Sequence, residues 1–461
     1  MICGWKISNS DNIYRTDYMK KMRVAVVRYE KPMESVKKAV QLCDGLAALK
    51  PGTKVFIKPN IVFWKMSPVY PKWGVVTTSR VIEDMVLLLK EKGINDITIG
   101  EGMVVGPKDI ETPEHAFESL GYGHLKKRYG VQYLNLLSQP YQKTDLGGGV
   151  VVKMNTEILS SDFVVNLPVL KTHSQTHVSL GIKNLKGTID VPSRKKFHGV
   201  DQVKDLHYQV ARLHEKMPPM FTLIDGIFSN ERGPGIDGHI RRLNILVASN
   251  DVLAGDFVGA KLLGFEPAAV PHLVHAAANQ KRSLDLDTVE VVGENISDLA
   301  LVHKSKFEFG QDDEGNCLPA PLIRRGLRGL SYRQYDLTLC TYCAEMTGHV
   351  ITAVAGAWKG TPWDKVEVLT GKKMKPTKGM NKTILLGKCM YQAHKKNPDI
   401  AEMIAVKGCP PKADDIVKAF HKARIKIDPN PVADPFYMPG LHMKRYKDKP
   451  EFDENLFKVQ G

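Results

Sequence analysis

Strand-like and helix-like patterns alternate along the first half of this chain. The strand-like apolar runs lie at 24–29, 54–62, 96–102, 150–155, 162–167, 221–228 and 243–249. The helical patterns lie at 33–46, 77–94 and 252–265. Such alternation is typical of a mostly parallel sheet with helices on both faces, because parallel neighbours need long crossover connections. We therefore expect a large, mostly parallel α/β domain over residues 22–330.

A second alternation begins near residue 330. Its predicted strands lie at 336–340, 365–371, 383–387 and 403–408, and its predicted helices at 344–360 and 412–425. We expect residues 331–426 to form a smaller C-terminal α/β domain, and residues 427–461, with four prolines before Met443, to form an extended arm. Residues 1–21 precede the first strand and are expected to be a disordered extension, with Met22 as the alternative start to Met1.

Composition limits the class of protein. No run approaches the ~18 uninterrupted apolar residues of a membrane helix, and the start of the chain lacks the apolar centre of a signal peptide. A cytoplasmic protein without a membrane partner is expected. The net charge of +15 favours an anionic partner, although a lysine-rich surface explains the charge equally well. The charged residues are scattered along the sequence, and no nucleic-acid-binding signature is present. Nucleic acid is therefore disfavoured as the partner.

Four cysteines crowd into the last quarter of the chain, each where a predicted strand ends. They are Cys340 and Cys343 in a CxxC pair, Cys389, and Cys409 before two prolines. Because the carboxyl ends of parallel strands share one edge of a sheet, we expect the four thiols to meet there.

Three interpretations of the cysteines stay open. We favour a 4Fe-4S cluster with four Cys ligands; structural zinc is the alternative cofactor, and zinc sites usually pair two CxxC elements. Unliganded reduced thiols are the third. If three thiols bind, one iron is open to substrate; if four bind, the cluster carries electrons.

The second group of candidates lies in the large domain. The segment 166–190 is dense in cationic and polar side chains, and we expect a loop that directs several donors at a carboxylate or phosphate; a polar loop without a ligand is the alternative. The candidate catalytic residues are Lys171, His173, His177 and His198. The candidate substrate-binding residues are Lys58, Asn60, Glu101, Lys183, Asn184, Lys186 and Asp225, several of them at the ends of predicted strands.

A run of short strings carries a family resemblance. KPNIV, TTSRVIEDMVLLLKEKG, IGEG, LPVLKTH, SLGIKNLKG, LIDGI and DVLAGDFVGAKLLG follow one another between about 54 and 280. In this order they resemble the domain-of-unknown-function family 362. The resemblance implies an iron–sulfur context but no established reaction. The chain lacks the family's frequent CxxCxxCxxxCP run, and its GCPP looks like the cysteine–proline element of other cluster-binding subunits. By fold analogy the layout is also similar to nickel-dependent lactate racemases.

These observations predict an iron–sulfur protein, a redox or lyase-type enzyme that acts on a small anionic substrate in the cleft between its domains. An electron donor such as ferredoxin is the expected protein partner. A non-catalytic electron-transfer or cluster-assembly protein is the main alternative. A zinc-stabilised nucleic-acid-binding protein is the further alternative.

Overall fold

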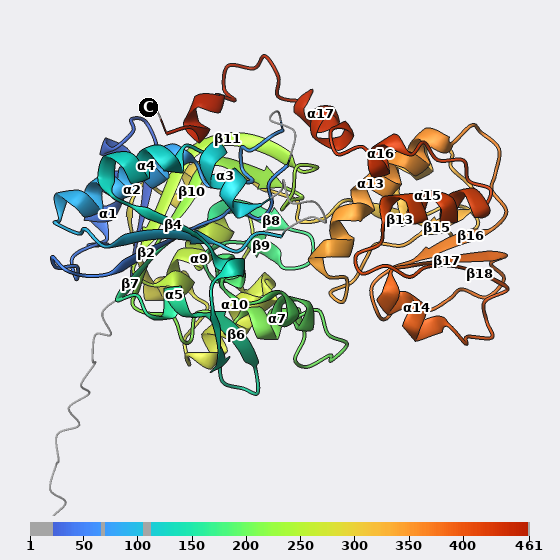
Figure 1. Cartoon of the computed structure of the whole chain (residues 1–461), viewed down its shortest axis with the longest axis horizontal. Helices are drawn as coiled ribbons and strands as arrows, with labels where there is room; N and C mark the ends of the chain where they lie inside the picture. The colour runs from blue at the N-terminus through green and yellow to red at the C-terminus, as the bar shows by residue number, and fades with distance from the viewer. Residues whose placement is uncertain (1–21, 66–69, 105–111, 460–461) are drawn as a thin grey trace, which may run out of the picture.

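Two lobes lie side by side, and the C-terminal segment crosses from the small lobe back over the large one (Figure 1). The computed structural model describes residues 22–65, 70–104 and 112–459. The extension expected at residues 1–21 lies outside this part of the chain.

The large lobe is built on a mixed sheet. In the described part of the chain its strand order is β12-β1-β11-β10-β7-β2-β3-β4, with β8 paired to β10 and β9 to β8. The pairs from β10 to β4 are parallel, whereas β11 is antiparallel to β1 and β10. The strands are β1 (Met22–Arg28), β2 (Val55–Pro59), β3 (Ile97–Glu101), β4 (Gln132–Asn135), β7 (Phe163–Leu167), β8 (Val169–His173), β9 (His177–Ser179), β10 (Met220–Glu231), β11 (His239–Ser249) and β12 (Val289–Gly293).

Helices cover both faces of this sheet, which confirms the predicted fold class. Alternate residues of β1 enter two separate cores: Ala25 and Val27 face one, and Val24 and Val26 face the other. One core contains α1 (Glu34–Leu42), α2 (Ser79–Glu91), α3 (Pro113–Ser119) and α4 (Tyr122–Tyr129). The other contains α6 (Gly181–Asn184), α8 (Leu206–Val210), α9 (Val252–Leu262) and α10 (Pro271–Asn279).

Two parts of the large lobe differ from the expected pattern. The run at 150–155 is β6 (Val151–Asn155), but it pairs with β5 (Tyr141–Asp145) in a separate hairpin instead of joining the main sheet. The region from 276 to 330, where periodicity fades, nevertheless supplies strand β12 to the main sheet. It also holds the hairpin of β13 (Phe309–Gln311) and β14 (Cys317–Pro319), followed by α12 (Ala320–Arg324).

The small lobe is a second α/β unit, as predicted. Its sheet has the order β15-β16-β17-β18 with every pair parallel. Residues of α13 and α15 share one core on this sheet, and Met390 of α14 packs on the other side with Leu369 and Leu385. The elements are β15 (Leu330–Tyr332), α13 (Thr341–Ala357), β16 (Val366–Leu369), β17 (Lys382–Leu386), α14 (Lys388–His394), β18 (Glu402–Val406) and α15 (Ala413–Lys422).

The strand predicted at 336–340 is wrong. The first strand of the small lobe is β15, and residues 336–339 form a turn in which the Asp336 carboxylate accepts a 2.7 Å hydrogen bond from the Thr338 N–H. An Asp that bonds to the backbone two residues on stabilises a turn in preference to a strand. Cys340 is therefore the N-cap of α13 rather than the end of a strand.

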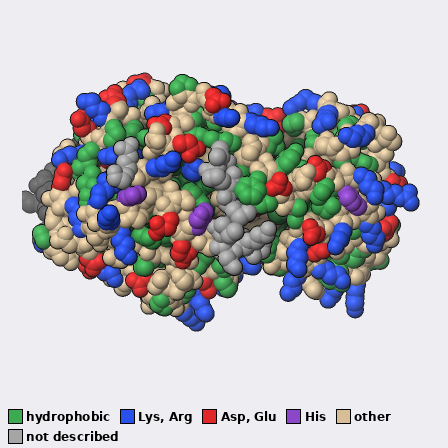
Figure 2. Space-filling model, turned by 45° about the horizontal axis from the view of Figure 1, so that its top comes forward, with side chains coloured by type: hydrophobic (Ala, Val, Ile, Leu, Met, Phe, Trp, Pro, Cys, Tyr) green, Lys and Arg blue, Asp and Glu red, His purple; other side chains and the backbone are tan. Residues whose placement is uncertain are grey.

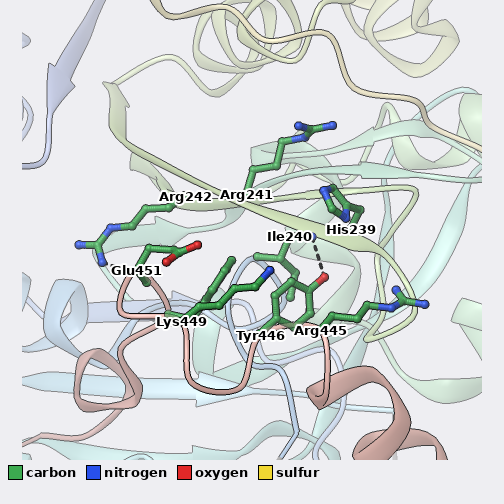
Figure 3. A pocket seen from close by; sticks show the side chains of 9 residues that line it. His239, Ile240, Arg241, Arg242, Arg445, Tyr446, Lys449 and Glu451 are labelled. Atoms are coloured by element: carbon green, nitrogen blue, oxygen red, sulfur yellow. Dashed lines mark hydrogen bonds between the residues drawn. The ribbon is translucent and has the colours of Figure 1, made fainter.

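The segment expected as an extended arm is partly helical and returns to the large lobe. It contains α16 (Asn430–Ala433) and α17 (Tyr437–Met443), and its Tyr446, Phe452 and Phe457 pack into the core beside α1 and α2. The Tyr446 hydroxyl accepts a 2.9 Å hydrogen bond from the Ile240 N–H of β11 (Figure 3).

A cavity of about 520 Å³ lies between this arm and β11. The heads of Arg241, Arg242 and Arg445 point in different directions around it (Figure 3). They bind Glu231 and backbone carbonyls instead of converging on one point. The contacts therefore anchor the arm.

In the described residues, no helix has the length and apolar character that a membrane span requires.

Candidate anion pocket and cysteine cluster

The carboxyl ends of β2 and β3 place a buried ion pair at the edge of the large sheet. The Lys58 Nζ lies 2.8 Å from the Glu101 Oε1, and both side chains are almost fully buried. The other carboxylate oxygen accepts a 2.6 Å hydrogen bond from the Ile61 N–H. Burial lowers the pKa of Lys58, and the Glu101 charge opposes that shift. Two of the predicted residues thus neutralise each other.

Further cations lie beside this pair without a carboxylate of their own. The Lys171 side chain is fully buried, and its Nζ donates a 2.8 Å hydrogen bond to the Val75 carbonyl. Burial, reinforced by the Lys183 charge, lowers the pKa of Lys171 well below its ordinary value. Burial also lowers the pKa of Lys183 to about 8. Burial thus disfavours the charged form of both lysines, and a bound anion would favour their protonation by supplying the missing opposite charge.

The β8–β9 hairpin positions the first histidine. His173 ends β8, and its Nδ1 accepts hydrogen bonds from the N–H groups of Gln175 at 3.1 Å and Thr176 at 3.4 Å. Because Nδ1 is an acceptor, Nε2 carries the proton of the neutral ring. Burial, with Lys183 and Lys186 nearby, lowers the pKa of His173 well below its ordinary value. His173 is therefore a neutral donor beside the lysines.

His177 is not brought into this pocket. It pairs with His173 across the hairpin, yet its ring lies 6.1 Å from the ring of His207 and 6.2 Å from that of Phe265. His207 in turn stacks on His272, which is fully buried and makes no hydrogen bond among the described residues. The predicted pair of histidines is therefore divided between two environments.

A second histidine, His198 of the large lobe, lies between Lys186 and the small lobe. The Lys186 Nζ lies 2.8 Å from the His198 Nε2, and the His198 Nδ1 lies 2.8 Å from the Leu337 carbonyl. Since a carbonyl only accepts, Nδ1 carries the proton and Nε2 accepts from the lysine. The ring can therefore relay a proton at Nε2 when Lys186 moves to a ligand.

Three predicted residues have structural roles. The Asn60 Nδ2 donates to the Val75 carbonyl at 2.6 Å. The Asn184 Nδ2 donates to the Asn166 side chain at 2.8 Å, and the Asp225 carboxylate accepts from the Thr78 N–H at 2.8 Å at the start of α2. These side chains hold the loops that carry the cations.

Sequence reasoning missed three residues at the junction of the lobes. Arg194 is buried and donates to the carbonyls of Gly187, Ile189 and Met103. The Lys195 Nζ lies 3.8 Å from the Cys409 Sγ and 4.9 Å from the centre of the Tyr342 ring. The Gln175 amide donates to the Asp336 and Leu339 carbonyls. The string SRKKFHG, directly after the dense segment, is the signal that could have revealed the first two.

The four cysteines gather around Cys343. The charges of Cys340, Cys389 and Cys409 all raise the pKa of Cys343, together with its hydrogen bond to Cys340 and burial. A Cβ added to Gly387, at the end of β17, would lie 3.6 Å from the Cys343 Sγ. The hydrogen bond from Cys343 and the backbone N–H groups at the start of α13 lower the pKa of Cys340 to about 6. The start of α13 thus favours the thiolate of Cys340.

The chemistry of these four thiols bears on what they could hold. Within the described ranges, no group of three or more His, Cys, Asp or Glu side chains is set to hold a metal ion. A single zinc at about 2.3 Å from each sulfur would need the sulfurs within about 4 Å of one another. A four-iron cluster binds each thiolate to a different iron and so suits more widely spaced sulfurs. The all-thiol donor set fits such a cluster.

The two candidate sites face each other across the junction of the lobes. The Cys340 charge raises the pKa of Lys186 against a larger lowering by burial, so this thiol and this ammonium group are close. His198 and Lys195 reach the small lobe at Leu337 and Cys409. The lysines and the thiols therefore lie on opposite sides of the contact between the lobes.

Comparisons with known proteins match parts of this chain to a curated relative, a solved structure and a family model. The thylakoid-associated protein sll1697 of Synechocystis sp. (strain ATCC 27184 / PCC 6803 / Kazusa) is 26% identical over 246 residues, which cover 53% of this chain and 72% of that protein. The lactate racemase apoprotein of Thermoanaerobacterium thermosaccharolyticum aligns with a TM-score of 0.34 and 16% identity over 52% of this chain and 57% of its own. Residues 55–261 match the family described as Domain of unknown function (DUF362). The predicted resemblance is thereby confirmed, and this segment is a DUF362 domain.

Proposed function

We propose that this protein is an iron–sulfur enzyme that binds a small anionic substrate, a carboxylate or a phosphate, in the crevice between its lobes. The observation that carries the proposal is the group of three lysines, the buried Lys171 and the half-buried Lys183 and Lys186, on the side of the large lobe near Cys340. Keeping several ammonium groups in a dry site destabilises the fold, and an anionic ligand offsets that cost. A site of this kind is built to bind negative charge.

The proposed cluster ligands are Cys340, Cys343, Cys389 and Cys409. A 4Fe-4S cluster held by all four thiols would supply electrons, whereas one held by three of them would leave an iron open to polarise a substrate oxygen. The protein residues supply the rest. Lys171 and Lys183 hold the substrate's negative charge, and His173 donates a hydrogen bond from Nε2. His198 moves a proton at Nε2. The reaction class that follows is redox or lyase-type.

The test is anaerobic purification followed by iron and sulfide analysis, visible absorbance, and electron paramagnetic resonance after reduction. We expect a brown protein with about four irons and four sulfides per chain, in line with a four-iron cluster. Single Cys→Ser variants at the four positions then count the ligands, with Cys43→Ser as the matched control. A colourless protein with stoichiometric zinc after reconstitution with iron and sulfide would contradict the proposal.

A non-catalytic electron carrier is the second candidate, and the exposure of Cys389 and Cys409 favours it. A centre open to solvent exchanges electrons readily with a protein partner. The two candidates differ at the pocket: Lys171→Ala and His173→Ala abolish turnover of a substrate but leave simple electron transfer intact.

We propose a cytoplasmic location. The name of the cyanobacterial relative calls that protein thylakoid-associated, so peripheral contact with a membrane surface is the alternative for this chain. Cell fractionation at low and high salt distinguishes the two, because a peripheral contact is released by salt.

A further inference from the structure

The positive charge of this chain is concentrated in one segment. Residues 365–426 contain fifteen Lys and Arg against five Asp and Glu, so they hold ten of the fifteen net positive charges. The expectation that the charge is scattered is therefore wrong. The segment forms most of the small lobe, and Lys and Arg side chains crowd the outer margin of that lobe (Figure 2).

Seven exposed lysines lie in and around α14, β18 and α15, the elements that flank Cys389 and Cys409. We call them the lysine face: Lys388, Lys395, Lys396, Lys407, Lys412, Lys418 and Lys422. Cys389 and Cys409 are exposed among them. In the part of the chain that the structure describes, none of the seven forms an ion pair. Their charge is therefore available to a partner.

A groove crosses this face. It has a volume of about 370 Å³ and lies between β18 and α15, lined by residues 404–407 together with Asp415, Lys418, Ala419 and Lys422. β18 is the last strand of its sheet, so among the described residues its outer edge is unpaired. The strand leads directly to Cys409. Lysines often protect such an edge from aggregation, but protection of β18 does not account for Lys388, next to Cys389, or for Lys395 and Lys396 after α14.

The surroundings favour one class of partner. The large exposed hydrophobic side chains of the described residues lie elsewhere, for example at Val203, Val302 and Phe436, and none lies in 365–426. The face therefore lacks the apolar anchors of a membrane-binding surface. The aromatic ring of Tyr391 lies under the Lys407 ammonium, 4.6 Å from its centroid, and is not free to stack on a base. An acidic protein surface remains the best complement.

We propose that the lysine face docks an acidic electron-carrier protein beside Cys389 and Cys409. The role of this docking site in electron transfer rests on the proposed function. Its location rests on the charge, the groove and the exposed thiols. Complementary charge speeds the encounter of two proteins and sets their register, and the groove brings the partner to the thiols at the end of β18.

The experiment measures binding of a strongly acidic plant-type [2Fe–2S] ferredoxin by calorimetry at low ionic strength. The variant reverses three charges of the groove, Lys407→Glu, Lys418→Glu and Lys422→Glu. Its matched control reverses three exposed charges of the large lobe, Lys38→Glu, Lys92→Glu and Lys127→Glu. We expect the groove variant to weaken binding roughly tenfold or more and the control to change it by less than about threefold. Circular dichroism verifies that both variants are folded.

Two results would overturn the proposal. Equal weakening by both triple variants would mean that only net charge matters. Stronger, groove-dependent binding of a single-stranded RNA oligonucleotide or of phosphatidylserine vesicles would assign the face to another partner. Binding is separable from the cluster: if ferredoxin binds through the groove while iron and sulfide analysis finds no cluster, the docking surface stands and the proposed function fails.

Discussion

Lys171 shows most directly how single residues serve binding at the expense of stability. Its ammonium group is fully buried and donates to one carbonyl. A methionine has a similar shape and no charge to desolvate. We therefore expect Lys171→Met to raise the free energy of unfolding by about 1–3 kcal/mol, as measured by urea denaturation. The same variant should lose at least tenfold in affinity for citrate or phosphate, as measured by calorimetry.

Lys143→Met is the matched control for this change, because Lys143 is exposed on the β5–β6 hairpin. It should alter neither the free energy of unfolding nor the affinity for citrate or phosphate measurably. A Lys171→Met variant that binds anions as the parent does would show that the buried charge has no role in the pocket.

The buried histidines predict the pH dependence of stability. Burial lowers the pKa of His207 from 6.5 to about 4, and that of His272 well below its ordinary value. Between pH 6.5 and 4 the unfolded chain binds these protons and the folded chain does not, so stability falls as the pH falls. Each such histidine contributes up to about 1.4 kcal/mol per pH unit.

Urea denaturation at pH 5, 6 and 7 measures this slope. His272→Leu, which removes one buried imidazole, should reduce the slope by up to one proton, and the exposed His124→Leu should not change it. An unchanged slope for His272→Leu would mean that this ring is charged in the folded protein.

At the residue scale, the sequence predicted which side chains lie at the ends of strands, but it did not predict which way those side chains face. Lys58 and Glu101 could be assigned to strand ends because an apolar run precedes each of them, and the structure pairs them. His173 and His177 look alike in sequence. A hairpin turn separates their surroundings, and that turn depends on contacts that local patterns do not contain.

At the scale of elements, the four-residue helix α6 depends on a distant carboxylate. The Asp256 side chain, from α9, accepts hydrogen bonds from the N–H groups of Gly181 at 2.6 Å and Ile182 at 2.9 Å. Asp256→Ala leaves two buried donors unsatisfied, and we expect it to lower the free energy of unfolding by about 2–4 kcal/mol. It should also weaken anion binding, because α6 carries Lys183.

Denaturant titration of three variants checks this prediction. Asp256→Asn keeps one acceptor and should fall between the parent and Asp256→Ala. Asp298→Ala, at an exposed position, should change stability by less than about 0.5 kcal/mol. Equal stability of parent and Asp256→Ala would show that α6 forms without this cap.

Elements with long regular patterns were predictable, and those set by turns or by distant partners were not. Helix α2 was expected at 77–94 and spans Ser79–Glu91. The segment at 336–340 was misassigned because its alternating Leu and Thr residues suit a strand, whereas the Asp336 turn determines its structure. The apolar residues of strand β12 show only weak periodicity. The strand forms because it pairs in parallel with β1.

At the scale of the whole molecule, the lobes meet through polar contacts. Gln175, Ser174 and His198 of the large lobe bind Leu339, Tyr335 and Leu337 of the small one. Interfaces of this kind within a chain usually permit relative motion. We therefore expect the distance between the lysines and the thiols to depend on these contacts, and a bound anion to favour the arrangement in which they are made.

The last prediction tests this coupling between the lobes. The buried Gln175 amide donates to the Asp336 carbonyl at 2.8 Å and the Leu339 carbonyl at 2.9 Å, next to Cys340. Gln175→Leu removes both bonds, so hydrogen exchange at 336–345 should quicken and the radius of gyration in solution scattering should increase. The matched control is Gln209→Leu, which removes a buried 2.9 Å bond to the Lys204 carbonyl within the large lobe. Faster exchange at 336–345 in both variants would contradict the coupling, since only one of the two glutamines spans the crevice.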